Sequence, residues 1–399
     1  MQLKRSPQSV LQALASGALA LPGLAHGDTP ETRWTGDYGY SLYSEDKVPA
    51  SKLAAGSRRR YAIDTHQFRL EGPLSGRLGM GLDFAYESMS GATPWYVEED
   101  ADGKPIQVMS GATIEEERVD TQLRGSYYFD NARAGAGAGF SLENDYTAVN
   151  GALEGETHFF EKNSTLGAGL GFSYDMLEPT DAQDFDRPQS ETKQSLSAFA
   201  AWSQVLGRSS TLQTSLAYQH QRGYLSDPYK LVSAGVDGNV RDDRPEQRNQ
   251  VTWLTRYRKH FSATGSTLHL DYRFYVDDWE INSHTLELAI HQAIWEAFRI
   301  VPSLRYYSQS AADFYGPFFD AAPAGPASSD YRLSPFGAFS WRIKGETRLR
   351  GWPFGMDWSA SVAYERYISS GDLALGKVSV ASPGLVSFDL VSVGLGGRF

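Results

Sequence analysis

Apolar and polar residues alternate along most of this chain. In the segment RLGMGLDFAYE, every second residue from Leu78 to Tyr86 is apolar, and the residues between them are small or charged. The segments STLHLDYRFYVDD, RNQVTWLTRYRKH and FGMDWSASVAYE show the same period of two. Because successive side chains of a β-strand point to opposite faces, this period predicts strands with one apolar and one polar face.

The alternating runs are longer than ordinary strands. They extend over roughly 11 to 16 residues, whereas strands of soluble proteins usually have about five or six and a tilted membrane-crossing strand needs about 9–11. Aromatic residues gather near the ends of runs, as at 127–129, 159–160 and 306–307, which is typical of the interfacial girdles of membrane barrels. A sheet in lipid must close on itself, because unpaired edge groups find no water there.

We therefore predict an all-β fold, a closed antiparallel transmembrane barrel of about sixteen strands, within a range of roughly 14–18. Short connections near 72–76, 130–131, 161–164, 207–210 and 262–266 alternate with longer ones near 45–60, 91–113, 179–190, 226–243, 315–330 and 371–383, as periplasmic turns alternate with extracellular loops. The strands are expected near 34–44, 61–73, 77–90, 114–129, 132–147, 151–161, 165–178, 191–206, 210–225, 244–259, 265–279, 282–296, 299–314, 331–344, 354–370 and 384–399. Two connections on the long-loop side, near 148–150 and 280–281, are expected to be short.

The first residues predict export. A basic start with Lys4 and Arg5 precedes an apolar run from Val10 to Leu21 and small residues up to Ala25, which is the pattern of a secretory signal peptide. We assign 1–25 to the signal peptide, with cleavage as late as residue 27 as the alternative, and 28–399 to one barrel domain. The chain has no cysteine, which excludes disulfides and thiolate metal sites, and a net charge of −11, which argues against nucleic-acid partners.

The segment LVSFDLVSVGLGGRF closes the chain with an alternating strand that ends on Phe399. A terminal aromatic residue in such a strand resembles the signal that the bacterial barrel-assembly machinery reads. Gly397 stands where a larger apolar residue is more usual.

Polar residues on the face opposite the apolar one are candidates for a lumen wall. Charges of both signs occur there, so they either set the selectivity of a pore or pair with one another to brace the wall. The candidates are Glu87, Asp120, Arg124, Arg256, Arg258, Asp271, Arg273, Glu287, Arg305, Gln309, Asp313, Arg342 and Glu365.

Histidines offer an alternative chemistry. His66 shares a strand face with Asp64, and His284 is expected near Asp277 and Asp278, so a catalytic site at the barrel rim is an alternative hypothesis. A metal site would need His269, Asp271 and His291 to align across strands. The glycine-rich segments 134–140 and 167–172 lack the ending of a phosphate loop, and we expect glycine there to leave room for neighbouring side chains in the lumen or to let the wall bend.

Several phrases in order resemble a family of Gram-negative outer-membrane β-barrels known only as a domain of unknown function. They are YSLYSED, YAIDTHQFRLEGPL, SGATPWY, ENDYTA, DDWEINSHTLEL and RYYSQSAADFYGP, which cover nearly the whole chain after the leader. The resemblance implies the fold and a Gram-negative outer-membrane location. It implies no activity, cofactor or catalytic residue.

The function we predict is a porin-like passive channel for small solutes, narrowed by the 91–113 or the 226–243 loop. The expected surroundings are outer-membrane lipid, lipopolysaccharide and the assembly machinery, with a homo-oligomer as an open alternative. A second hypothesis is a barrel scaffold or conduit for a periplasmic or surface partner, such as a redox protein. A hydrolase at the rim is the third. No enzyme activity and no cofactor is predicted.

Overall fold

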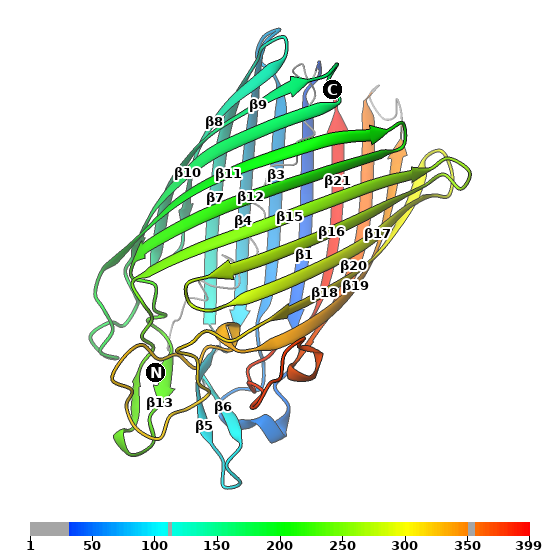
Figure 1. Cartoon of the computed structure of the whole chain (residues 1–399). Helices are drawn as coiled ribbons and strands as arrows, with labels where there is room; N and C mark the ends of the chain where they lie inside the picture. Colours follow the sequence, from blue (N-terminus) through cyan, green and yellow to red (C-terminus); the bar gives the residue numbers. More distant parts are fainter. Residues whose placement is uncertain (1–31, 111–113, 350–355) are drawn as a thin grey trace.

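Sixteen long strands form one closed barrel in the described residues of the computed structural model, which are 32–110, 114–349 and 356–399 (Figure 1). Around the barrel the order is β1-β21-β20-β19-β18-β17-β16-β15-β12-β11-β10-β9-β8-β7-β4-β3, and each strand pairs antiparallel with its neighbours. The predicted fold class and strand number are therefore confirmed. The strand bounds are Thr35–Glu45 (β1), Ala62–Pro73 (β3), Leu78–Gly91 (β4), Ile114–Tyr128 (β7), Ala132–Leu142 (β8), Tyr146–Phe159 (β9), Ser164–Leu177 (β10), Glu191–Gly207 (β11), Ser210–Gly223 (β12), Gln247–Phe261 (β15), Ser266–Asp277 (β16), Asn282–Ala293 (β17), Phe298–Gln309 (β18), Phe336–Leu349 (β19), Asp357–Ser370 (β20) and Ser387–Arg398 (β21).

The barrel closes where the first strand meets the last. β1 and β21 pair in continuous register from Thr35 opposite Arg398 to Glu45 opposite Phe388. Beyond the strands, the Trp34 amide donates to the Phe399 carbonyl (3.0 Å) and the Phe399 amide donates to the Trp34 carbonyl (2.9 Å). Backbone pairing therefore extends to the last residue of the chain, so neither strand leaves an open edge.

The connections divide the barrel into a turn end, where they are short, and a loop end, where most are long (Figure 1). Some predicted boundaries were wrong. The strands expected at 299–314 and 331–344 are Phe298–Gln309 and Phe336–Leu349, and the short connection expected near 148–150 lies at 143–145. There the Glu143 amide donates to the Tyr146 carbonyl at 2.7 Å and closes a tight turn, and the strand that follows begins at Tyr146. The alternating pattern assigns the polar residues of this turn to the preceding strand.

Small sheets that the sequence did not predict stand at the loop end. β2 (Leu53–Ala55), β6 (Pro105–Met109) and β5 (Pro94–Glu99) form one, and β13 (Leu231–Ser233) pairs with β14 (Asn239–Arg241). Four short 3-10 helices accompany them among the described residues: η1 (Ala50–Lys52), η2 (Gly235–Asp237), η3 (Tyr331–Leu333) and η4 (Gly371–Leu373). In the described part of the chain, no helix is both long and apolar enough to cross a membrane. The predicted signal peptide lies outside the described residues.

The polar face of each strand is the inner wall of the barrel. Leu254 and Val301 lie on that face and are only 4% and 7% exposed, whereas longer polar side chains such as Arg305 extend into the lumen and stay exposed. On the opposite face, Leu153 is 63% and Val362 58% exposed. Large apolar side chains thus cover the outside, which is the arrangement that surrounding lipid demands.

Glycines in β8 make room on the inner wall. A Cβ atom at Gly139 would lie 2.2 Å from the Gln122 side-chain oxygen, and one at Gly135 would lie 3.0 Å from the Glu154 side chain. The alternating glycines of AGAGAGF therefore let long polar side chains of β7 and β9 lie flat against the wall, as the sequence indicated.

Candidate functional site

The inner wall and the loops over one of its openings are the candidate functional site. On β4 and β7, Arg118 lies between two carboxylates, 3.6 Å from Glu87 and 3.6 Å from Asp120. Arg124 donates to Asp83 at 2.5 Å. The candidates on this side of the lumen are therefore bound into ion pairs that brace neighbouring strands.

On β15 and β16, Asp271 is engaged by two arginines. It lies 3.0 Å from an Arg258 nitrogen and 3.7 Å from Arg256. The remaining candidates on the wall, Arg273, Glu287, Arg305, Arg342 and Glu365, occupy inner positions of β16 to β20 and form no ion pair among the described residues. The structure thus brings the predicted charges onto one surface but pairs only some of them.

Two candidates belong to the rim. The Gln309 side chain donates to the carbonyls of Ser334 (2.7 Å) and Arg332 (2.9 Å), so it ties β18 to the segment that follows. Asp313 lies beyond the end of β18 with an exposed side chain, and its amide donates to the Trp279 carbonyl at 3.0 Å. It is not part of the strand wall.

Five loop-end segments interlock, and we call them the lid: 46–61, 92–110, 224–246, 310–335 and 371–386. The Lys230 ammonium donates to the Pro94 carbonyl (3.2 Å), and Arg60 donates to Glu45 (2.7 Å) and to the Gly384 carbonyl (3.1 Å). The connection that carries Lys230 joins β12 to β15, whereas Pro94 follows β4, six positions around the barrel from β12. Because a contact between such distant connections has to bridge the opening, the lid covers the loop end of the lumen (Figure 1).

Two of the sequence phrases that carried the family resemblance meet where the lid joins the barrel rim. Trp279, in the turn between β16 and β17, packs edge-on against Phe314 with ring centroids 5.1 Å apart. Ile281, Ala312 and Leu333 complete this buried apolar cluster. The phrases DDWEINSHTLEL and RYYSQSAADFYGP therefore form an anchor that fixes the 310–335 segment to the barrel rim.

A buried ionic cluster joins the 224–246 and 310–335 segments. Asp330, only 1% exposed, accepts from Arg244 at 2.9 Å and from the Arg332 Nε at 2.8 Å, and Arg332 also reaches Asp227 at 3.0 Å. Burial opposes ionisation of Asp330, but Arg332, Lys230 and Arg244 together hold its pKa well below the ordinary value. Sequence reasoning missed this cluster, because its members lie about a hundred residues apart and no local pattern joins them.

Carboxylates gather at the turn between β8 and β9. Oxygen atoms of Glu116, Glu143 and Asp145 lie within 4.8 Å of one another, a spacing that could hold a metal ion. The Arg118 guanidinium lies 3.7 Å from Glu143 and supplies positive charge there. Burial raises the pKa of Glu143 to about 8, with Arg118 opposing the shift and the neighbouring carboxylates adding to it.

The two suspected catalytic histidines lie on the outer face. His66 Nδ1 is 2.9 Å from the Tyr38 hydroxyl, and His284 Nδ1 is 2.8 Å from the Tyr272 hydroxyl. The expected closeness of His284 to Asp277 was wrong, because Asp277 is on the inner face and binds Arg248 at 2.8 Å. His66 shares strand parity with Phe68 and Leu70, and this pattern could have placed it outside.

The hypothetical metal set does not assemble. His269 and His291 lie together on the inner wall with ring centroids 4.0 Å apart. Asp271, however, is held by Arg258 and Arg256. The three do not form a metal-ligand group within the described residues.

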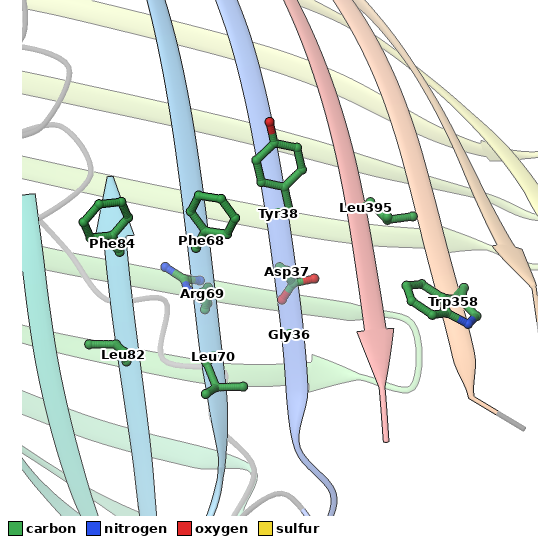
Figure 2. A pocket seen from close by; sticks show the side chains of 10 residues that line it. All are labelled: Gly36, Asp37, Tyr38, Phe68, Arg69, Leu70, Leu82, Phe84, Trp358 and Leu395. Carbon is green, nitrogen blue, oxygen red and sulfur yellow. The ribbon is translucent and has the colours of Figure 1, made fainter. Parts of the chain in front are cut away.

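An apolar groove lies on the outside of the wall near the turn end (Figure 2). It encloses about 320 Å³ between side chains such as Phe68, Leu70, Leu82 and Leu395. Gly36 lies at its floor and contributes no side chain to fill it. The groove opens away from the lumen, so it takes no part in the inner site.

Comparison with solved structures gives distant matches. A bacterial polysaccharide outer membrane secretin aligns at TM-score 0.47 and 11% identity over 92% of this chain and 98% of that chain. OccK1 (OpdK) of Pseudomonas aeruginosa aligns at 0.43 and 10% over 92% and 98%, and the siderophore receptor PirA of the same organism at 0.45 and 12% over 91% and 62%. At these TM-scores and identities, the likenesses carry no argument about function.

Sequence comparison gives the family. Comparison of the sequence with curated proteins finds no match. A family described as "Protein of unknown function (DUF3570)" matches residues 11–380, most of the sequence. This extent agrees with the resemblance found in the sequence phrases. The chain belongs to the DUF3570 family, and its fold is a closed transmembrane β-barrel.

Proposed function

We propose that the protein is a passive channel for small solutes in the outer membrane of a Gram-negative bacterium, with the loop end outside and the turn end in the periplasm. The observation that carries this proposal is the inner wall, which bears charged and polar side chains on strands all around the barrel while the outside is apolar. A barrel of this strand number can enclose an aqueous lumen. Charged side chains on such a wall keep water in the lumen and interact with passing solutes.

The lid sets the size of solute in this proposal. The two loops named as alternatives for narrowing the channel both contribute to it, 226–243 in full and 91–113 through its described residues up to 110, and the Lys230 contact with Pro94 joins them. Solutes therefore pass between packed segments and not through a wide mouth. Outer-membrane lipid, lipopolysaccharide and the barrel-assembly machinery, for which Phe399 is the proposed signal, are the partners that this location implies.

We propose no enzymatic role for the histidines of the barrel. His66 and His284, the histidines considered for catalysis, are bonded to tyrosines of neighbouring strands on the outer face. Each lies among aromatic rings of the outer face, His66 beside Tyr38 and His284 beside Tyr272 and Phe274, as residues of an interfacial aromatic girdle would.

Liposome swelling tests the channel. Vesicles that contain the folded protein are expected to swell in isosmotic arabinose and more slowly in sucrose, with little swelling in raffinose, because the lid narrows the path. Protein-free vesicles serve as the control, and faster gel migration before boiling shows that the barrel is folded. Folded protein that leaves the vesicles as impermeable to arabinose as the control would contradict the proposal.

A further inference from the structure

Charge is distributed unevenly around the lumen. The inner face of β1 to β9 has an excess of carboxylates, whereas the inner face of β15 to β20 has an excess of cations. The acidic side carries Asp37, Glu45, Glu71, Asp83, Glu87, Glu116, Asp120, Glu154 and Glu156 against Arg69, Arg118, Arg124 and Arg133. The basic side carries Arg248, Arg256, Arg258, Arg273, Arg299, Arg305, Arg342, Lys344 and Arg348 against Asp271, Asp277, Glu287, Glu346, Asp357 and Glu365.

Each arginine on the acidic side forms an ion pair with a carboxylate of the wall. Arg69 donates to Asp83 at 2.6 Å, and Arg133 reaches Glu154 at 2.8 Å and Glu156 at 3.0 Å. Such pairs offset the positive charge of the guanidinium, which weakens its attraction for a passing anion. These residues therefore brace the wall.

Arg273 and Arg305 differ from those arginines. The Arg273 Nε is buried and has no hydrogen-bond partner within the described residues. The Arg305 side chain is exposed to the lumen and makes neither a hydrogen bond nor an ion pair with any described residue. The carboxylate nearest in register, Glu287, stands opposite Arg305 but forms no ion pair with it.

The two arginines lie near each other on the inner wall. They flank β17, with Arg273 opposite Thr285 and Arg305 opposite Glu287, two residues further along β17. Between them β17 presents Thr285, a short side chain in register with both Arg273 and Tyr307. Two guanidinium groups therefore flank a short side chain, and the buried Nε of Arg273 has no acceptor among the described residues. An oxyanion bound between them would supply that acceptor and balance their charge.

We propose that Arg273 and Arg305 bind the oxyanion group, carboxylate or phosphate, of a small solute in the lumen. Arg342 is the next contact toward the turn end, because it stands in register with Ser303, two residues before Arg305 on β18. This inference rests on the proposed channel function and gives that channel a substrate class: small organic oxyanions.

Calorimetric titration of the folded protein in detergent with succinate, and separately with inorganic phosphate, tests the site. We expect saturable binding by the wild type and a rise in Kd of at least about tenfold for Arg273→Gln and for Arg305→Gln, the size expected when one charged hydrogen-bond donor is lost. Arg124→Gln is the matched control. It removes an equal charge from the lumen, but from an arginine paired with Asp83, and should leave the Kd unchanged.

Planar-bilayer current separates this inference from the channel itself. Succinate is expected to reduce the potassium chloride current of the wild type and of Arg124→Gln but not that of Arg305→Gln. A wild-type current that succinate does not affect, together with no heat of binding, would overturn the oxyanion site and leave the channel standing. Succinate binding in a protein that carries no current would overturn the channel and leave the site. Equal weakening by Arg124→Gln and Arg305→Gln would show only a general effect of lumen charge and would also overturn the site.

Discussion

Replacing Asp330 by asparagine is expected to destabilise the lid by about 3–5 kcal/mol, the usual cost of removing one partner from a buried ion pair. Asp330 is the carboxylate shared by Arg244 and Arg332 inside the lid, and Lys230 adds a third nearby cation. Without the negative charge, these cations repel one another in a site with little water. The 224–246 and 310–335 segments should then separate, while the strands stay paired.

The measurements are limited trypsin digestion of the protein in vesicles and single-channel conductance. For Asp330→Asn we expect cleavage in the lid to be much faster and conductance to rise severalfold, with unchanged heat-dependent gel migration. Asp313→Asn is the control, because Asp313 lies in the same segment with an exposed side chain; its effect on stability should stay within about 0.5 kcal/mol. If the two variants resist trypsin equally, the buried cluster does not hold the lid.

Replacing Glu143 by glutamine is expected to remove a pH-dependent loss of stability. In the unfolded chain this carboxyl ionises near its ordinary pKa of 4.5, whereas burial raises its pKa to about 8 in the folded protein. Between these two pH values the folded state holds a proton that the unfolded state releases, so the free energy of unfolding falls as pH rises. The accumulated loss is on the order of 3–5 kcal/mol above pH 8.

Urea unfolding in vesicles at pH 4 and pH 9 measures this difference. Wild type and Glu143→Gln should be about equally stable at pH 4, where the carboxyl is mostly neutral in both states, and the variant should be more stable at pH 9. Glu161→Gln, at an exposed turn, should follow the wild type at both pH values. A Glu143→Gln protein that loses as much stability as wild type between pH 4 and pH 9 would refute the burial of Glu143 as the cause.

The barrel could be predicted from the sequence because a transmembrane strand is a local pattern. Within each run of alternating residues, such as 268–276, the sequence alone shows which side chains share the apolar face. Because lipid cannot bond to unpaired strand edges, the strands must then close into a barrel. The same rule placed Arg273 and Arg305 opposite the apolar face. It could not show which arginines find partners, since Arg258 and Arg305 have the same pattern and differ only in their neighbours across strands.

The lid could not be predicted, because it depends on contacts between loops that are distant in sequence. Asp330 meets Arg244, and Lys230 meets Pro94, only after the barrel has fixed where each loop begins. The alternation of apolar and polar residues does not show which loop residues become buried, and the charges of these segments resemble those of an ordinary solvated loop. Trp279 and Phe314 were the available signal, since bulky aromatic residues in polar connections indicate a buried cluster.

Which face of the barrel meets lipid is the point on which the channel, the lid and the oxyanion site all depend. Leu123 and Gln122 are neighbours on β7 with opposite orientations, and Leu123 lies midway between Val119, which pairs with Tyr86, and the aromatic Tyr127. The decisive measurement is the free energy of unfolding, in vesicles, of Leu123→Arg compared with Gln122→Arg. We predict a loss of about 2–4 kcal/mol for Leu123→Arg, the cost of an arginine facing the middle of the bilayer, and little loss for Gln122→Arg, which would face Asp83 and Asp120. Equal losses, or a larger loss for Gln122→Arg, would contradict an apolar outside and a charged lumen.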